Sequence, residues 1–158
     1  RRVREIGRRR SDVRRHVPLG EVIARCLEHD EGVEFGRGVS SDDEPAIWRR
    51  DLTGRVTGWI EVGAPSTDRL HRAGKLAERV AVYTWKDAPR YAASIAEAKV
   101  HRAEGLHLVA LDPAFLDAVA ATLDKSNRWD LSVSGAALYL TIAGKLFEST
   151  AERVVIPL

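Results

Sequence analysis

The sequence predicts a mixed α/β or α+β fold in which helices flank a β-sheet. The first observation behind this prediction is the order of elements expected over residues 19–84, which is helix, three strands, helix and strand. Elements in that order pack the helices onto a sheet. The second is the apolar segment Val80–Thr84, which is typical of a strand covered on both faces. A chain of 158 residues can bury a sizeable core, so we expect a single domain over residues 1–158.

The first helix is expected over Leu19–His29, because its apolar residues recur at the three-to-four spacing of a buried stripe. Cys26 belongs to that stripe and is interpreted as a small core residue. Short apolar segments bounded by glycine, proline or charged turns then indicate strands. These strands are expected at Val33–Phe35, Ala46–Arg50 and Val56–Val62.

The second half of the chain continues the same pattern. Ser66 or Thr67 is a plausible helix N-cap, and the helix that follows is expected to run to about Arg79 with Leu70 and Ala73 on its buried side. The remaining strands are expected at Val80–Thr84, Leu106–Leu111, Leu131–Val133 and Leu138–Ile142, the last two forming a closing hairpin. The remaining helices are expected at Ala88–Ala103 and Ala114–Leu123.

Composition restricts the cellular location and the binding partners that we expect for the protein. The only cysteine is Cys26, so no intrachain disulfide can form and the reducing cytoplasm is the default location. No apolar run is long enough to span a bilayer, so no membrane partner is expected. Residues 1–16 carry eight arginines against two acids, a local charge of +6. This arginine block could contact nucleic-acid phosphates, or it could be a frayed, solvated terminus.

Acidic residues occur at two points of the predicted sheet. Asp42, Asp43 and Glu44 lie in the turn before one strand, and Glu61 lies inside the next strand, which is otherwise apolar. A carboxylate in an apolar strand is costly to bury unless it is paired or binds a cation. Mg²⁺ is held by one or two carboxylates together with water and phosphate. The first hypothesis is therefore a metal-assisted phosphodiesterase site; the alternative is a solvated acidic turn with Glu61 facing solvent.

Several segments together resemble the YaeQ family of small bacterial proteins. The matching segments are Phe35–Ser40, Asp42–Trp48, Asp51–Gly54, Trp59–Pro65, Arg69–Leu70 and Val80–Thr84. The similarity extends more weakly to about Ile142. Residues 1–18 are basic and poorly matched, and the opening strands of a typical member are not evident here.

The resemblance implies a variant of the PD-(D/E)XK, or restriction-endonuclease-like, nuclease fold. In such a site two acids bind a divalent cation, and a lysine orients or activates the attacking water. Carried over to this sequence, Asp43 (or its neighbours Asp42 and Glu44) takes the first metal-binding role and Glu61 takes the second. Mg²⁺ is the implied cofactor, and nucleic acid is the implied partner.

The lysine of the motif is absent from its usual place, because Gly63 stands two residues after Glu61. The following helix offers Arg69, Arg72 and Lys75 instead. At 100° per residue Lys75 points away from the apolar stripe, whereas Arg69 lies at its edge and could reach the sheet. Arginine stays protonated and cannot act as a general base, although it can bind phosphate.

Two functions therefore follow from the sequence. The first is a metal-dependent nuclease-like protein that acts on or binds nucleic-acid phosphodiesters, with Asp43, Glu61 and either Arg69 or Lys75 in catalytic roles. The second is a non-catalytic nucleic-acid- or protein-binding regulator that retains the fold. Convergence of the Asp43 and Glu61 carboxylates with a basic side chain would favour the enzyme. A Glu61 fixed in an ion pair away from Asp43 would favour the binding protein.

Overall fold

The computed structural model describes residues 2–8, 16–38, 41, 43–124 and 126–158. The strands of this part of the chain form one nine-stranded mixed sheet in the order β1-β7-β8-β9-β6-β5-β4-β3-β2. Strands β4, β5 and β6 are parallel to one another, and the other neighbours are antiparallel. The bounds are β1 Arg2–Arg8, β2 Val33–Phe35, β3 Ile47–Arg50, β4 Val56–Val62, β5 Arg79–Thr84, β6 His107–Leu111, β7 Ser126–Ser134, β8 Ala137–Ile142 and β9 Lys145–Val154.

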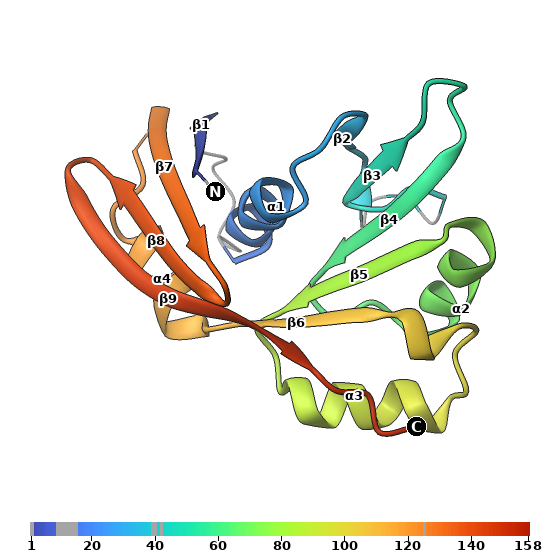
Figure 1. Ribbon diagram of the computed structural model, residues 1–158. Helices are drawn as coiled ribbons and strands as arrows, with labels where there is room; N and C mark the ends of the chain where they lie inside the picture. Colours follow the sequence, from blue (N-terminus) through green and yellow to red (C-terminus); the bar gives the residue numbers. More distant parts are fainter. Residues whose placement is uncertain (1, 9–15, 39–40, 42, 125) are drawn as a thin grey trace.

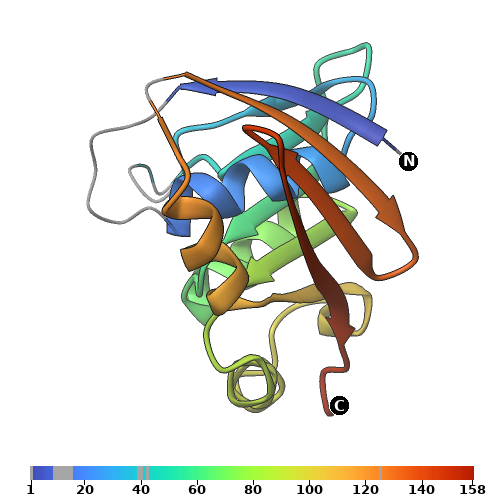
Figure 2. The ribbon, with the colours of Figure 1, turned by 90° about the vertical axis from the view of Figure 1, so that its left-hand side faces the viewer.

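Strand β9 joins the two halves of this sheet. Its first part, residues 145–150, pairs with β8, and residues 151–154 pair with β6. The sheet bends along this strand, so that β1, β7 and β8 form one wing and β2 to β6 form the other (Figures 1 and 2). Helix α1 (His16–Leu27) lies between the two wings (Figure 1).

The other helices are α2 (Thr67–Leu76), α3 (Ala88–Glu97) and α4 (Pro113–Ala120). One core lies under α1 and α4 and takes side chains from both wings, such as Ile60 and Leu131. A second core lies on the other side of the sheet, where α2 contacts β4 and β5, and α3 contacts β6 and β9. Successive residues of a strand face opposite sides. In β4, Ile60 and Val62 therefore enter the first core, while Trp59 enters the second.

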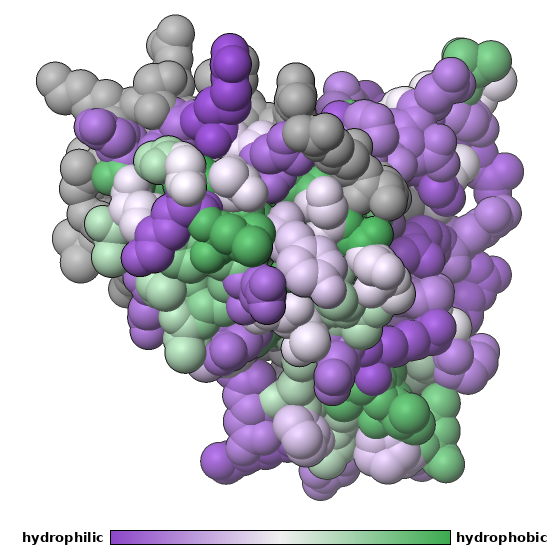
Figure 3. Space-filling view, turned by 60° about the vertical axis from the view of Figure 1, so that its left-hand side comes forward, coloured by the Kyte–Doolittle hydropathy of each residue, from purple (hydrophilic) through white to green (hydrophobic). Residues whose placement is uncertain are grey.

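Large apolar side chains are exposed on β8 and β9. Tyr139 in β8 and Leu146 in β9 are exposed, and Figure 3 shows apolar and weakly polar side chains gathered on the face that is turned forward there. Charged side chains gather instead over other parts of that view.

The expected mixed sheet flanked by helices is confirmed, and the strands expected over residues 33–84 match β2 to β5 closely. The helix expected over Ala88–Ala103 is wrong in length: α3 ends at Glu97, and Lys99 and Arg102 adopt positive φ angles that a helix cannot contain. The hairpin of β7 and β8 is confirmed, but it does not close the fold, because β9 follows it.

The opening strand was also missed. Residues 2–8 form β1 and pair with β7, so a frayed terminus is the wrong interpretation for this segment. The arginine-rich sequence hides the strand because it lacks the apolar alternation by which strands are recognised. Residues 9–15, which hold the rest of the arginine block, lie outside the described part of the chain.

Candidate functional site

The acid that the sequence places inside a strand is buried beneath helix α2. Glu61 lies in β4 and is 1% exposed, and Arg69 in α2 is 8% exposed. The two side chains form a bidentate ion pair, in which Arg69 Nε donates to Glu61 Oε2 at 2.6 Å and Nη2 donates to Oε1 at 3.0 Å. Planar pairs of this kind are the strongest form of charge-assisted hydrogen bond.

Trp59 completes the environment of this carboxylate. Its indole Nε1 donates to Glu61 Oε1 at 3.1 Å, from two residues earlier on the same strand face. Each oxygen of Glu61 thus accepts at least one hydrogen bond from the protein. These bonds stabilise a carboxylate that would otherwise be buried at high cost.

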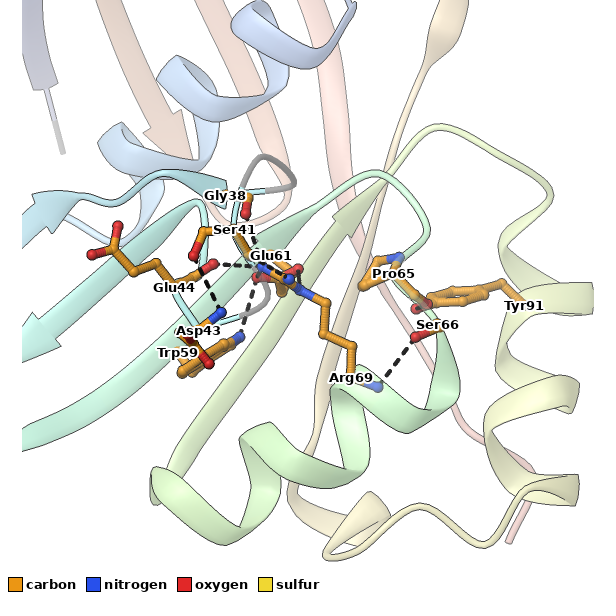
Figure 4. A network of polar contacts seen from close by, with 10 residues as sticks. All are labelled: Gly38, Ser41, Asp43, Glu44, Trp59, Glu61, Pro65, Ser66, Arg69 and Tyr91. Atoms are coloured by element: carbon orange, nitrogen blue, oxygen red, sulfur yellow. Dashed lines mark hydrogen bonds and ion pairs between the residues drawn. The ribbon is translucent and has the colours of Figure 1, made fainter.

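Arg69 also binds the segment that contains the acidic run. Its guanidinium donates to the backbone oxygens of Gly38, Ser41 and Glu44 (Figure 4). Backbone oxygens buried without a donor would each cost free energy comparable to a lost hydrogen bond. A single buried guanidinium therefore joins α2, β4 and the segment between β2 and β3.

Local sequence explains how Arg69 reaches this position. The Ser66 side chain caps α2 by accepting from Arg69 N at 3.2 Å, which fixes the start of the helix. The preceding turn is held by Tyr91 in α3, whose hydroxyl donates to the oxygen of Pro65 at 2.7 Å (Figure 4). Gly63 directly follows β4 and has a φ of 97°, a conformation that L-residues with side chains rarely adopt. The lysine position of the motif is thus a tight turn in this chain.

The other acidic candidates lie apart from the buried pair. Glu44 is bound by Arg37, whose backbone N and Nε donate to its Oε2 at 2.9 and 3.1 Å. The backbone hydrogen bond from Arg37, followed by the one from its side chain, lowers the pKa of Glu44. Asp43 is exposed, and its backbone N donates to Ser41 Oγ at 3.2 Å. The side chain of Glu44 points away from Glu61 in Figure 4. Asp42 lies outside the described residues.

The basic candidates are divided in the same way. Arg69 is brought to Glu61, whereas Arg72 and Lys75 are exposed on α2. For Lys75 this is the orientation that the helical geometry predicts. Within the described part of the chain no group of three or more His, Cys, Asp or Glu side chains could hold a metal ion. With its oxygens bonded to Arg69 and Trp59, Glu61 does not fit the role of a metal ligand in this arrangement.

A second, partly buried ion pair, which the sequence did not predict, lies on the other side of the sheet. Arg79 at the start of β5 donates from Nε and Nη2 to both oxygens of Glu28, at 3.0 and 2.8 Å, and the hydroxyl of Tyr83 donates to Glu28 Oε1 at 2.7 Å. No sequence signal marks this pair, because Glu28 and Arg79 are 51 residues apart.

The pair predicts an acid dependence of stability. Burial raises the pKa of Glu28, but the hydrogen bonds from Arg79 and Tyr83 and the charge of Arg79 together lower it below its usual 4.5. A lowered folded-state pKa gives stability that is complete above about pH 4.5 and is lost as the pH falls through the folded-state value. Glu28→Gln should therefore cost about 1–3 kcal/mol at pH 7 and unfold with a shallower pH dependence in acid.

Urea unfolding at pH 7 and in acid checks this expectation. Glu34→Gln is the control, because Glu34 forms a 3.6 Å ion pair with Arg50 on the surface and should change little. Equal acid dependence of the wild type and Glu28→Gln would contradict the prediction.

The fold and the site are those of a small mixed α+β protein whose bent sheet buries a carboxylate–guanidinium pair under a helix. The chain belongs to the YaeQ family, since the family model described as YaeQ protein matches residues 18–151. No helix among the described residues is long and apolar enough to cross a membrane.

Two curated proteins are similar to the chain in sequence. It is 29% identical over 116 residues to the uncharacterised protein YaeQ of Escherichia coli K12, covering 71% of this chain and 62% of that protein. It is 28% identical over 118 residues to the Salmonella typhi protein, covering 72% and 64%. The chain thus spans less than two thirds of the length of these relatives.

Solved structures share the fold. The YaeQ protein from Pseudomonas syringae superposes with a TM-score of 0.83 at 24% identity, covering 93% of this chain and 82% of that one. The YaeQ protein from Xanthomonas axonopodis pv. citri gives 0.73 at 27% identity, covering 87% and 78%.

Proposed function

We propose that this protein binds nucleic acid without cleaving it and keeps a nuclease-like frame. The order α1, β2, β3, β4, α2, β5 supports the frame, because it repeats the helix, three strands, helix and strand of the PD-(D/E)XK core. Exposed cations on the neighbouring segments support the partner: Arg37 follows β2, and Arg72 and Lys75 lie on α2. Cations of this kind bind phosphates irrespective of base sequence.

We infer the absence of cleavage from the hydrogen bonds that Glu61 accepts. A divalent cation at Glu61 would have to displace Arg69 from a carboxylate that is 1% exposed. The displaced guanidinium would leave the backbone oxygens of Gly38, Ser41 and Glu44 without their donor. Separating one partner from a buried ion pair costs about 3–5 kcal/mol, which works against metal binding in the folded protein.

A second candidate, a Mg²⁺-dependent nuclease, is favoured by one contact pattern. Arg69 binds both Glu61 and the segment that holds Asp43, so the two acids of the motif lie on elements joined by one side chain. In that case Asp43 and Glu61 would hold the ion, which would stabilise charge on the phosphate. Lys75 and Arg69 would remain the candidates for the basic group.

One experiment separates the two candidates. The protein and its Glu61→Gln and Asp43→Ala variants are incubated with single- and double-stranded DNA and RNA, with Mg²⁺ or Mn²⁺, and binding is measured at two salt concentrations. We expect no cleavage by any of them, and binding that weakens as salt rises. Metal-dependent cleavage that both substitutions abolish would overturn the proposal in favour of the nuclease. Cleavage that persists in both variants would overturn both site assignments. Absence of binding would overturn the nucleic-acid partner and favour the protein-binding regulator.

A further inference from the structure

We propose that Arg79, His107 and Arg153 form a phosphate-binding site on the α1 side of the sheet. These residues are separate from the Glu61–Arg69 pair, which lies on the α2 side. The proposed site can therefore be tested independently of the function proposed above.

Sheet register places the three residues along one diagonal of the same sheet face. They lie on the neighbouring strands β5, β6 and β9. Arg79 shares its strand face with Ala81, which is the register partner of His107. His107 in turn shares its face with Val109, which pairs with Arg153. His107 therefore lies between the two arginines, on the face that also carries Tyr83.

The guanidinium of Arg79 is fixed in position by its ion pair with Glu28. Glu28 accepts from its Nε and from Nη2, and the Glu28 side chain, which is 7% exposed, is fixed further by the Tyr83 hydroxyl. A guanidinium has five N–H donors, so donors remain beyond the two that Glu28 receives. The Arg79 side chain is 32% exposed, so part of it is accessible to a ligand. A guanidinium fixed by such a pair loses little freedom when it binds an anion.

Arg153 adds positive charge to this face, and His107 lies between Arg153 and Arg79 in the strand order. Glu28 is already bonded to Arg79, and Arg153 is exposed. Burial lowers the pKa of His107, and the charges of Arg79 and Arg153 lower it further, against an opposite influence of Glu28. The charged groups that act on His107 thus come from β5, from β9 and from the end of α1.

A phosphate group matches this arrangement in charge and in donors. Arginine forks bind phosphate oxygens bidentately, and an imidazole can donate a further hydrogen bond. A bound anion would favour protonated His107, so binding should take up a proton. The affinity should therefore fall as the pH rises through the imidazole pKa in the complex. The phosphate could belong to a small phosphorylated molecule or to a nucleic-acid backbone.

The test uses the whole chain with three probes: inorganic phosphate, a 5′-mononucleotide and a single-stranded oligonucleotide. Calorimetry gives affinities, and NMR follows the His107 ring against pH with and without phosphate. We expect Arg153→Gln and His107→Gln to weaken mononucleotide binding at least about tenfold, which is the effect of about 1.4 kcal/mol. Arg102→Gln is the matched control, because Arg102 is an exposed arginine in the loop before β6 and should bind as the wild type does.

Each outcome decides the proposal. A rise in the His107 pKa with phosphate and a selective loss in the Arg153 and His107 variants support it. Oligonucleotide binding that depends on Arg153 and exceeds mononucleotide binding assigns the phosphate to nucleic acid; the reverse order assigns it to a small molecule. Equal affinity of the Arg153→Gln variant and the wild type, equal weakening by Arg102→Gln, or no binding of any probe would overturn it. Circular dichroism of each variant separates lost binding from lost fold.

Discussion

Replacing Glu61 by alanine is expected to destabilise the protein by about 3–5 kcal/mol, because it leaves the buried guanidinium of Arg69 without its carboxylate. Arg69 is 8% exposed, so water cannot replace the missing oxygens without opening the site. Trp59 Nε1 would also lose its acceptor. The measurement is the free energy of unfolding in urea, from the midpoint and slope of the transition.

Two further variants are measured beside Glu61→Ala, a control and a double variant. Glu44→Ala is the control for loss of an acid from the same region, and it should change stability little, because Glu44 is paired with the exposed Arg37. The double variant Glu61→Leu with Arg69→Met replaces the ion pair by apolar side chains, a change that is often neutral for an isolated buried pair. Here it should restore only part of the loss, because the oxygens of Gly38, Ser41 and Glu44 still lack a donor.

Two outcomes of these measurements would contradict the structural role of the Glu61–Arg69 pair. Full recovery in the double variant would show that Arg69 serves Glu61 alone and not the segment before β3. A loss below about 1 kcal/mol for Glu61→Ala is the size of an ordinary substitution. It would show that the pair opens readily, and an exchange of Arg69 for a cation would then become the better account.

Gly63→Lys, which writes the motif lysine into its usual place, is expected to destabilise by about 1–3 kcal/mol. The reason is the φ of 97° at Gly63, which a residue with a Cβ adopts only under strain. Gly63 is also buried, and its N donates to the oxygen of Tyr83 at 2.8 Å, so the turn cannot shift without losing that bond. We expect no gain of cleavage, because Glu61 stays bonded to Arg69.

Ala64→Lys is the matched control for this substitution. Ala64 is exposed and is not among the residues with positive φ, so a lysine there should be tolerated. Thermal unfolding of both variants and a cleavage assay with Mg²⁺ are the measurements. Equal stability of the two variants would show that the turn relaxes, and metal-dependent cleavage by Gly63→Lys would show that Glu61 is available to a cation.

Local patterns predicted most of the strands and helices near the site. Val56–Val62 was recognisable because β-branched and aromatic residues lie between glycines, and Ser66 marked the start of α2. The patterns failed for strands that are formed by pairing with neighbouring strands and do not have an apolar strand-like sequence. β1 is rich in arginine, and β9 divides its pairing between β8 and β6. Neither segment shows the simple alternation of a half-buried strand.

The sequence by itself determined that Glu61 lies in an otherwise apolar strand and that Arg69 lies at the edge of the apolar face of the next helix. Both follow from periodicity, which is local. Only the tertiary structure decided what these residues do together. The oxygens that Arg69 binds at Glu44, Ser41 and Gly38 are 25, 28 and 31 residues away in the chain. Such contacts depend on how the segment before β3 folds over β4, and hydrogen bonds over that separation leave no periodic trace. For the same reason two acids that look like a metal site in the sequence occupy different environments, one paired under a helix and one exposed.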